Sequence, residues 1–288
     1  MIATVNKYLS LVKFAHTIFA MPFALIGFFM ATIKADQPFR WMVLLLVVLC
    51  MVFARSAAMG FNRWLDAEID KRNPRTASRE IPAGIISARN ALLFVIGNAL
   101  LFIVTTWFIN PLCFALSPVA LLVVLGYSYT KRFTALCHLV LGLGLSLAPI
   151  GAYLAVTGEF ALLPILISIL VICWVSGFDI IYALQDEDFD RSQQLNSIPT
   201  WLGKAGGLRF SEFLHLISAA MVISAGVYGQ FHWLYWIGAG VFIAMLLSQH
   251  LLVKPNDLSR VNLAFMTTNG IASVVFAVFA IADMLIFH

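Results

Sequence analysis

Residues 41–61 read WMVLLLVVLCMVFARSAAMGF and are followed directly by NRWLDAEID at residues 62–70. The first segment is apolar over about 20 residues, the length that an α-helix needs to cross the hydrocarbon core of a bilayer. The second segment places one amide and two carboxylates four residues apart. This combination predicts a membrane-spanning helix that ends in a row of oxygen ligands at the membrane surface.

The composition of the whole chain agrees with a membrane protein. Hydrophobic residues make up 61% of the 288 positions and charged residues 11%, whereas soluble domains are about 45–50% apolar and about 25% charged. Backbone groups in lipid must be satisfied internally, and the runs are too long for barrel strands. We therefore expect an all-α membrane protein, with residues 1–288 forming one domain. Nine transmembrane helices are predicted, at 9–33, 41–62, 90–109, 112–129, 135–157, 161–184, 209–228, 232–252 and 263–286.

The basic residues of the loops occur almost entirely in every second loop, and the other loops hold only Lys34 and Arg40. By the positive-inside rule, the N-terminus and the basic loops face the cytoplasm. We expect a multi-pass protein of a bacterial cytoplasmic (inner) membrane, whose formal net charge of +4 requires no nucleic-acid partner. The four cysteines lie in apolar runs and are expected to be core residues. Nothing in the sequence selects an oligomeric state.

Most carboxylates of the chain lie in two of the basic loops, which follow the second and sixth runs. Positions four apart share one face of a helix, and hard oxygen ligands in a row suit Mg²⁺, which is commonly shared with substrate phosphates. Arginine forks match phosphate oxygens. The pattern predicts a Mg²⁺ and diphosphate site at the mouth of a membrane bundle. The oxygen-bearing residues are Asn62, Asp66 and Asp70 in the first row, and Asp179, Tyr182, Asp186 and Asp190 in the second; the neighbouring basic residues are Arg75, Arg79 and Lys131.

Three motifs carry a family resemblance. NRWLDAEIDKRNPRTASREIPAG at 62–84, GYSYTKR at 126–132 and DIIYALQDEDFDR at 179–191 resemble the signatures of the UbiA superfamily of intramembrane prenyltransferases. The resemblance covers nearly the whole chain. It implies a helical bundle around a lipid-accessible central cavity that transfers a polyprenyl chain from a prenyl diphosphate to an aromatic acceptor.

The resemblance also implies roles for individual residues. Two Mg²⁺ ions would lie at the cytoplasmic end of the cavity, and a carboxylate, Asp179 or Asp190, would take the proton released by the acceptor ring. The implied metal ligands are Asn62, Asp66, Asp70, Asp186 and Asp190, and the implied substrate-binding residues are Arg75, Arg79, Tyr127, Lys131 and Tyr182.

Arg55 lies within the second run, about two turns before Asn62. A charge at that depth is costly and indicates function, and the resemblance places an acceptor carboxylate beside it. The acceptor predicted first is 4-hydroxybenzoate, as in ubiquinone biosynthesis; 1,4-dihydroxy-6-naphthoate, of the futalosine route to menaquinone, is the alternative.

The buried polar side chains have other possible partners. Arg55 could instead pair with Asp179. His16 could hydrogen-bond an acceptor hydroxyl, and His138 is expected to be a contact between helices.

A secondary transporter is the alternative from another functional class. Transporters place ionisable groups near the middle of the bilayer on broken helices. Here the acids gather at the cytoplasmic rim, and only Arg55 and Asp179 lie deeper. The sequence therefore favours the enzyme.

Overall fold

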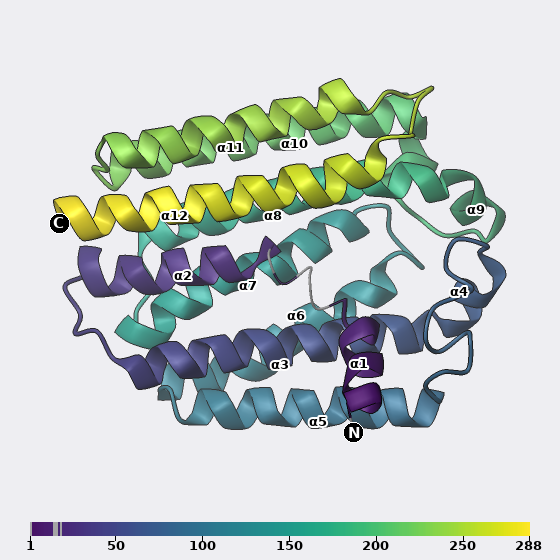
Figure 1. Cartoon of the computed structure of the whole chain (residues 1–288), viewed down its shortest axis with the longest axis horizontal. Helices are drawn as coiled ribbons and strands as arrows, with labels where there is room; N and C mark the ends of the chain where they lie inside the picture. The colour runs from purple at the N-terminus through teal and green to yellow at the C-terminus, as the bar shows by residue number, and fades with distance from the viewer. Residues whose placement is uncertain (1, 14–16, 18) are drawn as a thin grey trace.

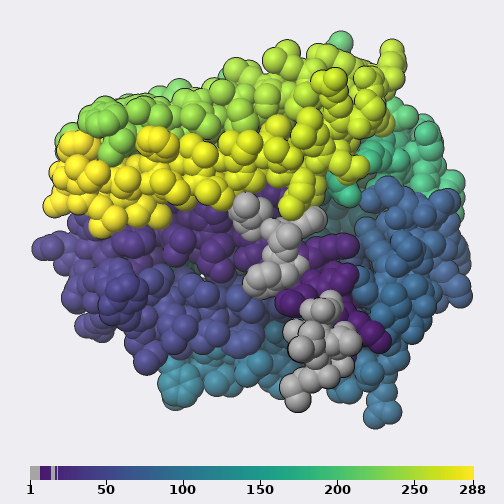
Figure 2. Space-filling view, viewed as in Figure 1, coloured from purple at the N-terminus to yellow at the C-terminus, as the bar shows by residue number. Residues whose placement is uncertain are grey.

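The computed structural model describes residues 2–13, 17 and 19–288. In this part of the chain the long helices run side by side along one axis, with the C-terminus at one end of the bundle and the short helices α4 and α9 at the other (Figure 1). The C-terminal helices α11 and α12, green to yellow, form one side of the molecule, and purple and blue helices from the first part of the chain lie against them (Figure 2). The elements are α1 Ile2–Leu11, α2 Met21–Phe29, α3 Trp41–Leu65, α4 Ala67–Arg72, α5 Ala88–Trp107, α6 Pro111–Thr130, α7 Cys137–Thr157, α8 Leu162–Ala183, α9 Glu187–Ser192, α10 Ile198–Tyr228, α11 Trp233–Leu252 and α12 Asn269–Phe287.

Eight helices of the described chain are long and apolar enough to cross a bilayer, and Met21–Lys34 is a shorter apolar helix. The predicted all-α membrane fold is therefore confirmed, and the predicted count of nine spans holds approximately. The expected first span, 9–33, is wrong as a continuous helix. The helix that ends at Lys34 begins at Met21 because Pro22, which lacks a backbone N–H, favours the first turn of a helix.

Helix α1 is a separate element that crosses the long helices at a steep angle (Figure 1). Its Tyr8 ring stacks on Phe94 of α5, with ring centroids 4.9 Å apart. Leu11 at its end is buried in a small cluster with Ile86 and Ala91. This packing holds α1 against the end of the bundle that carries α4 and α9.

The other helix boundaries follow local signals in the sequence. The Asn110 side chain accepts a hydrogen bond from the backbone N–H of Cys113 at 2.8 Å and so caps α6. Ser197 and Thr200 form a capping box at the start of α10. That helix starts before the predicted 209 and bends at Gly203, where φ is 71°.

The interior is divided between a packed half and a hollow half. Trp174 of α8 is fully buried and contacts the rings of Phe23, Phe178 and Phe242. This aromatic core joins α2, α8, α11 and α12. The hollow half lies among α3, α5, α6 and α7, whose facing residues line a cavity of about 390 Å³.

Helices α2 and α7 approach closely through Gly27, where a Cβ atom would lie 2.0 Å from the backbone oxygen of Pro149. We expect Gly27→Ala to cost about 1–3 kcal/mol through overpacking, because a backbone atom cannot move aside as a side chain can. Thermal unfolding of the detergent-purified protein measures the effect. Gly97→Ala in α5 is the matched control, since a Cβ there meets nothing within 4 Å; equal melting temperatures for the two variants would contradict this reading.

Candidate functional site

The first row of acids begins where α3 ends. Asp66 has non-helical backbone angles (φ −92°, ψ 6°) and separates α3 from α4. The helical hydrogen-bond pattern nevertheless continues, from Asp66 N to Asn62 O at 3.0 Å and from Asp70 N to Asp66 O at 2.7 Å. The Asn62 amide also donates to Asp66 Oδ2 at 3.2 Å. The four-residue spacing therefore aligns these side chains, as the sequence predicts.

Asp66 is only 2% exposed and is paired with two cations. Lys131 Nζ lies 2.6 Å from its Oδ2, and Arg132 Nη2 lies 3.0 Å from its Oδ1. Both cations follow α6, so this carboxylate joins the first acidic loop to the α6–α7 loop. Arg132 was not among the predicted site residues, although it is adjacent to Lys131 in the GYSYTKR motif.

Asp70 is paired on one side only. Arg79 Nη1 lies 2.7 Å from Asp70 Oδ1. Asp70 Oδ2 is buried and has no hydrogen-bond partner among the described residues. A buried carboxylate oxygen without a partner is costly, so this atom is suited to receive a further positive charge.

The second row is bound to the first loop through Asp186. The Arg75 guanidinium contacts both of its oxygens, with Nη2 at 2.5 Å from Oδ2 and Nε at 2.9 Å from Oδ1. Arg75 Nη1 also donates to Tyr182 Oη at 3.1 Å. Asn73, which the sequence reading missed, donates to Asp186 Oδ1 at 3.2 Å. These contacts hold the two acidic loops together.

Charge and burial shift the pKa of two groups in these loops. Burial, followed by the charge of Asp186, raises the pKa of Asp190 in α9 to about 6. Burial lowers the pKa of Arg75, but its hydrogen bond and charge interaction with Asp186 outweigh that and raise it. Crowded carboxylates and a firmly charged Arg75 thus lie at one end of the bundle.

Asp179 lies deeper, in α8, and its carboxylate is hydrogen-bonded to His138 of α7. His138 Nδ1 is 2.7 Å from Asp179 Oδ2, and the side chains are 5% and 25% exposed. No ion pair joins Asp179 to Arg55 among the described residues, so the alternative pairing of these two groups is wrong. His138 does contact another helix, as expected, but its partner is a candidate site residue. His16 lies outside the described residues.

Arg55 and Tyr127 line the cavity of the hollow half. Arg55 lies seven residues before Asn62, about 10 Å along α3 at 1.5 Å per residue. Its Nε is buried without a hydrogen-bond partner among the described residues. Beyond these two side chains the lining is almost entirely apolar and extends to Cys113, about 20 Å along α6. An apolar chain with a charged head would match this polarity gradient.

The sequence of the chain matches the model of the UbiA prenyltransferase family over residues 20–271. The chain belongs to this family. A 4-hydroxybenzoate octaprenyltransferase of Nitrosomonas europaea is 30% identical to this UbiA family member over 239 residues, which cover 82% of the chain and 80% of the relative.

Solved structures of UbiA homologues share the fold. The apo structure of a homologue from Aeropyrum pernix K1 superposes with a TM-score of 0.81 at 28% identity, covering 94% of this chain and 98% of the other. A homologue from Archaeoglobus fulgidus bound to GPP and Mg²⁺ superposes with a TM-score of 0.76 at 20% identity, covering 97% of this chain and all of the other. The second likeness concerns the fold alone.

The residues of this UbiA family member fit Mg²⁺. The two rows offer carboxylate and amide oxygens, the donors that Mg²⁺ prefers, and they include the unpartnered buried oxygen of Asp70. Asp66 and Asp186 are already paired with basic side chains that could turn to a phosphate. The acidic rows therefore can hold both a cation and an anion.

We expect Mn²⁺, which takes the same oxygen ligands as Mg²⁺, to bind more weakly to Asp70→Asn and Asp186→Asn than to the unchanged protein. Outer-shell partners alone are worth roughly 10–100-fold in metal affinity, so the loss should reach at least about tenfold. The electron paramagnetic resonance signal of free Mn²⁺ measures it. The control is Asp188→Asn in the same loop, whose side chain is 91% exposed; a loss as large in this control would contradict the assignment.

Proposed function

We propose that this protein transfers a polyprenyl chain from a prenyl diphosphate to an aromatic acceptor that carries a carboxylate, with 4-hydroxybenzoate as the first candidate. One observation carries the proposal. A partly buried cluster of paired acids and bases lies at the mouth of a long apolar cavity, and a single arginine, Arg55, marks the boundary between them.

The diphosphate would bind at the acidic and basic loops. Its oxygens suit the guanidinium forks of Arg75 and Arg79 and the ammonium of Lys131, with Tyr127 and Tyr182 as hydroxyl donors. Mg²⁺ would be held by the side chains of Asn62, Asp66, Asp70, Asp186 and Asp190. When bound, Mg²⁺ supplies positive charge that stabilises the departing diphosphate. The A. fulgidus homologue, which has the same fold, was solved bound to GPP and Mg²⁺.

The cavity would hold the prenyl chain and exclude water from the reacting carbon. The bond between the allylic carbon and the diphosphate oxygen breaks, and both electrons leave with the diphosphate. The resulting allylic cation is attacked by a ring carbon of the acceptor, which then loses a proton. An apolar lining protects the cation from hydrolysis, which accounts for the scarcity of polar side chains beyond Arg55 and Tyr127.

Arg55 would bind the acceptor carboxylate, because its guanidinium lines the cavity and its Nε has no hydrogen-bond partner among the described residues. Asp179 would accept the ring proton, with His138 holding one of its oxygens at 2.7 Å and leaving the other available. Asp190, with its raised pKa, is the second candidate for this role. The carboxylate of 1,4-dihydroxy-6-naphthoate would suit Arg55 equally, so this acceptor remains the alternative.

The distribution of basic loops supports a place in the cytoplasmic membrane of a bacterium, with the N-terminus and the acidic loops facing the cytoplasm. A role as a secondary transporter is less well supported. The paired acids lie in and around α4 and α9, at the C-terminal ends of two long helices, and Arg55 lines an apolar cavity rather than a chain of ion-binding groups.

We expect the purified protein with Mg²⁺ and geranyl diphosphate to prenylate 4-hydroxybenzoate or 1,4-dihydroxy-6-naphthoate, offered in parallel. Product formation, followed by liquid chromatography and mass spectrometry, should be lost with chelator and in Asp66→Ala and Asp186→Ala, because both changes remove oxygen ligands. Asp188→Asn should retain activity. Failure to bind geranyl diphosphate in the presence of Mg²⁺ would refute the proposal, whereas binding without transfer to either acid would redirect the search to another acceptor.

Two substitutions should separate the acceptor site from the proton acceptor. Arg55→Gln removes a charged hydrogen-bond donor worth about 1.5–3 kcal/mol, so it should raise the KM for the aromatic acid more than tenfold while kcat changes less. Asp179→Asn keeps the bond to His138 sterically possible but removes the base, and should lower kcat by about 10²–10⁴-fold. Steady-state kinetics measures both, and an unchanged kcat in Asp179→Asn would transfer the role of base to Asp190.

A further inference from the structure

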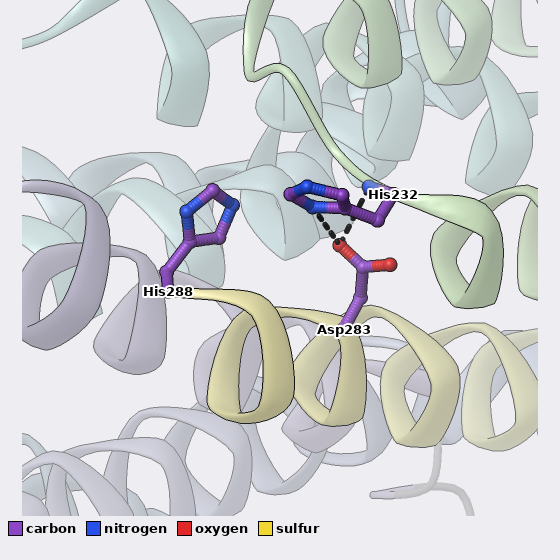
Figure 3. A group of neighbouring side chains, drawn as sticks. All are labelled: His232, Asp283 and His288. Carbon is purple, nitrogen blue, oxygen red and sulfur yellow. Dashed lines mark hydrogen bonds and ion pairs between the residues drawn. The ribbon is translucent and has the colours of Figure 1, made fainter.

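A second cluster of ionisable side chains lies at the end of the bundle opposite the acidic loops. It consists of His232 in the loop before α11, Asp283 in the last turns of α12, and His288 (Figure 3). One ligand atom from each residue lies within 4.8 Å of the others. Among the described residues this is the only such group of histidine, cysteine and acidic side chains.

The first turn of α11 fixes the carboxylate of this cluster. Asp283 is fully buried, and its oxygens accept hydrogen bonds from the backbone N–H groups of His232 at 2.9 Å and Tyr235 at 3.1 Å. Each carboxylate oxygen can accept more than one hydrogen bond. Asp283 therefore keeps lone pairs available on a rigid support.

Aromatic contacts orient the two imidazoles. The His232 ring stacks on Phe287 with centroids 4.7 Å apart and planes 25° apart. Its Nδ1 lies 3.9 Å from Asp283 Oδ2, on the side of the ring that Figure 3 shows facing the carboxylate. The His288 ring lies edge-on to His232 with centroids 5.2 Å apart. Both rings are exposed at their outer edges, while the carboxylate beneath them is buried.

Lys34, which follows α2, approaches the same cluster. Its ammonium donates to the backbone oxygen of Gly229 at 2.7 Å and contacts Nε2 of His288. The ammonium thus places a positive charge beside the imidazole and the buried carboxylate. A cation that coordinates His288 through Nε2 would have to displace this contact.

We propose that His232, Asp283 and His288 form a binding site for a divalent transition-metal ion of the Zn²⁺ type. Two imidazoles and one carboxylate are a set of three ligands typical of Zn²⁺, and imidazole nitrogen selects such ions over Mg²⁺. Tetrahedral coordination with bonds of 2.0–2.1 Å sets ligand atoms about 3.3 Å apart. The 3.9 Å between His232 Nδ1 and Asp283 Oδ2 is close to that value. The exposed side chain of His288 can move the remaining distance toward the ion.

Such an ion would tie Asp283 of α12 and His288, which follows that helix, to His232 in the α10–α11 loop. This end of the bundle is far from the acidic rows. The two ends of the molecule would then bind different cations. The oxygen ligands of the acidic rows suit Mg²⁺, and the mixed nitrogen and oxygen ligands of the His232 cluster suit Zn²⁺. The site is independent of prenyl transfer.

The test is Zn²⁺ titration of the full-length protein in detergent by isothermal calorimetry, with excess Mg²⁺ present to occupy the acidic rows. Co²⁺, whose visible absorption reports nitrogen ligation, serves as a second probe. We expect one Zn²⁺ per chain, with affinity lowered at least about tenfold in His232→Gln and in His288→Gln. His250→Gln, a histidine of α11 outside the cluster, is the control and should bind as the unchanged protein does.

Lys34→Gln distinguishes a metal site from a cluster that serves only the structure, because only a metal site should bind Zn²⁺ more tightly after this change. Removal of the ammonium frees His288 and takes away a positive charge that acts on Asp283, so Zn²⁺ should bind more tightly than to the unchanged protein. Weaker or equal binding in Lys34→Gln, unchanged binding in His288→Gln, or loss of the Zn²⁺ signal in Asp186→Asn alone would each overturn the proposal.

Discussion

The contact on which the site depends is the double pairing of acidic and basic loops at one end of the bundle. Asp66 binds Lys131 and Arg132, and Asp186 binds Arg75. These charges are partly removed from water, where opposite charges attract more strongly. The cost of desolvation offsets that gain, but the loss of one partner leaves a large penalty. Three loops from distant parts of the sequence are therefore held over the mouth of one cavity.

That arrangement requires the interior to be unevenly filled. The aromatic core around Trp174 packs α8 against α2, α11 and α12, and it supplies a rigid wall. The opposite half, among α3, α5, α6 and α7, remains open enough for an apolar ligand. A bundle packed equally on both sides would have no room for an apolar ligand of this length.

The depth of each ionisable group in the bundle matches the part it would play. Arginines and carboxylates at the rim stay close to water, which reduces the cost of charge. Asp179 and Arg55 lie deeper, and each meets a different environment: Asp179 is bound by His138, whereas Arg55 Nε has no partner among the described residues. The carboxylate of Asp179 is therefore held in place by a neighbour, whereas the guanidinium of Arg55 is available to a ligand.

The amino-acid sequence alone determined the membrane environment, the all-helical class, the main spans, both acidic rows and the family signatures, because these depend on local composition and on a spacing of four residues. The start of the shorter apolar helix at Met21 could also have been predicted from Pro22, but the apolar composition of the whole stretch 9–33 concealed it. Only the tertiary structure decided that His138 rather than Arg55 pairs with Asp179, that Arg132 and Asn73 join the site, and that His232 lies beside Asp283. Those contacts join residues 41 to 113 positions apart, and their geometry comes from how helices pack, which no local pattern encodes.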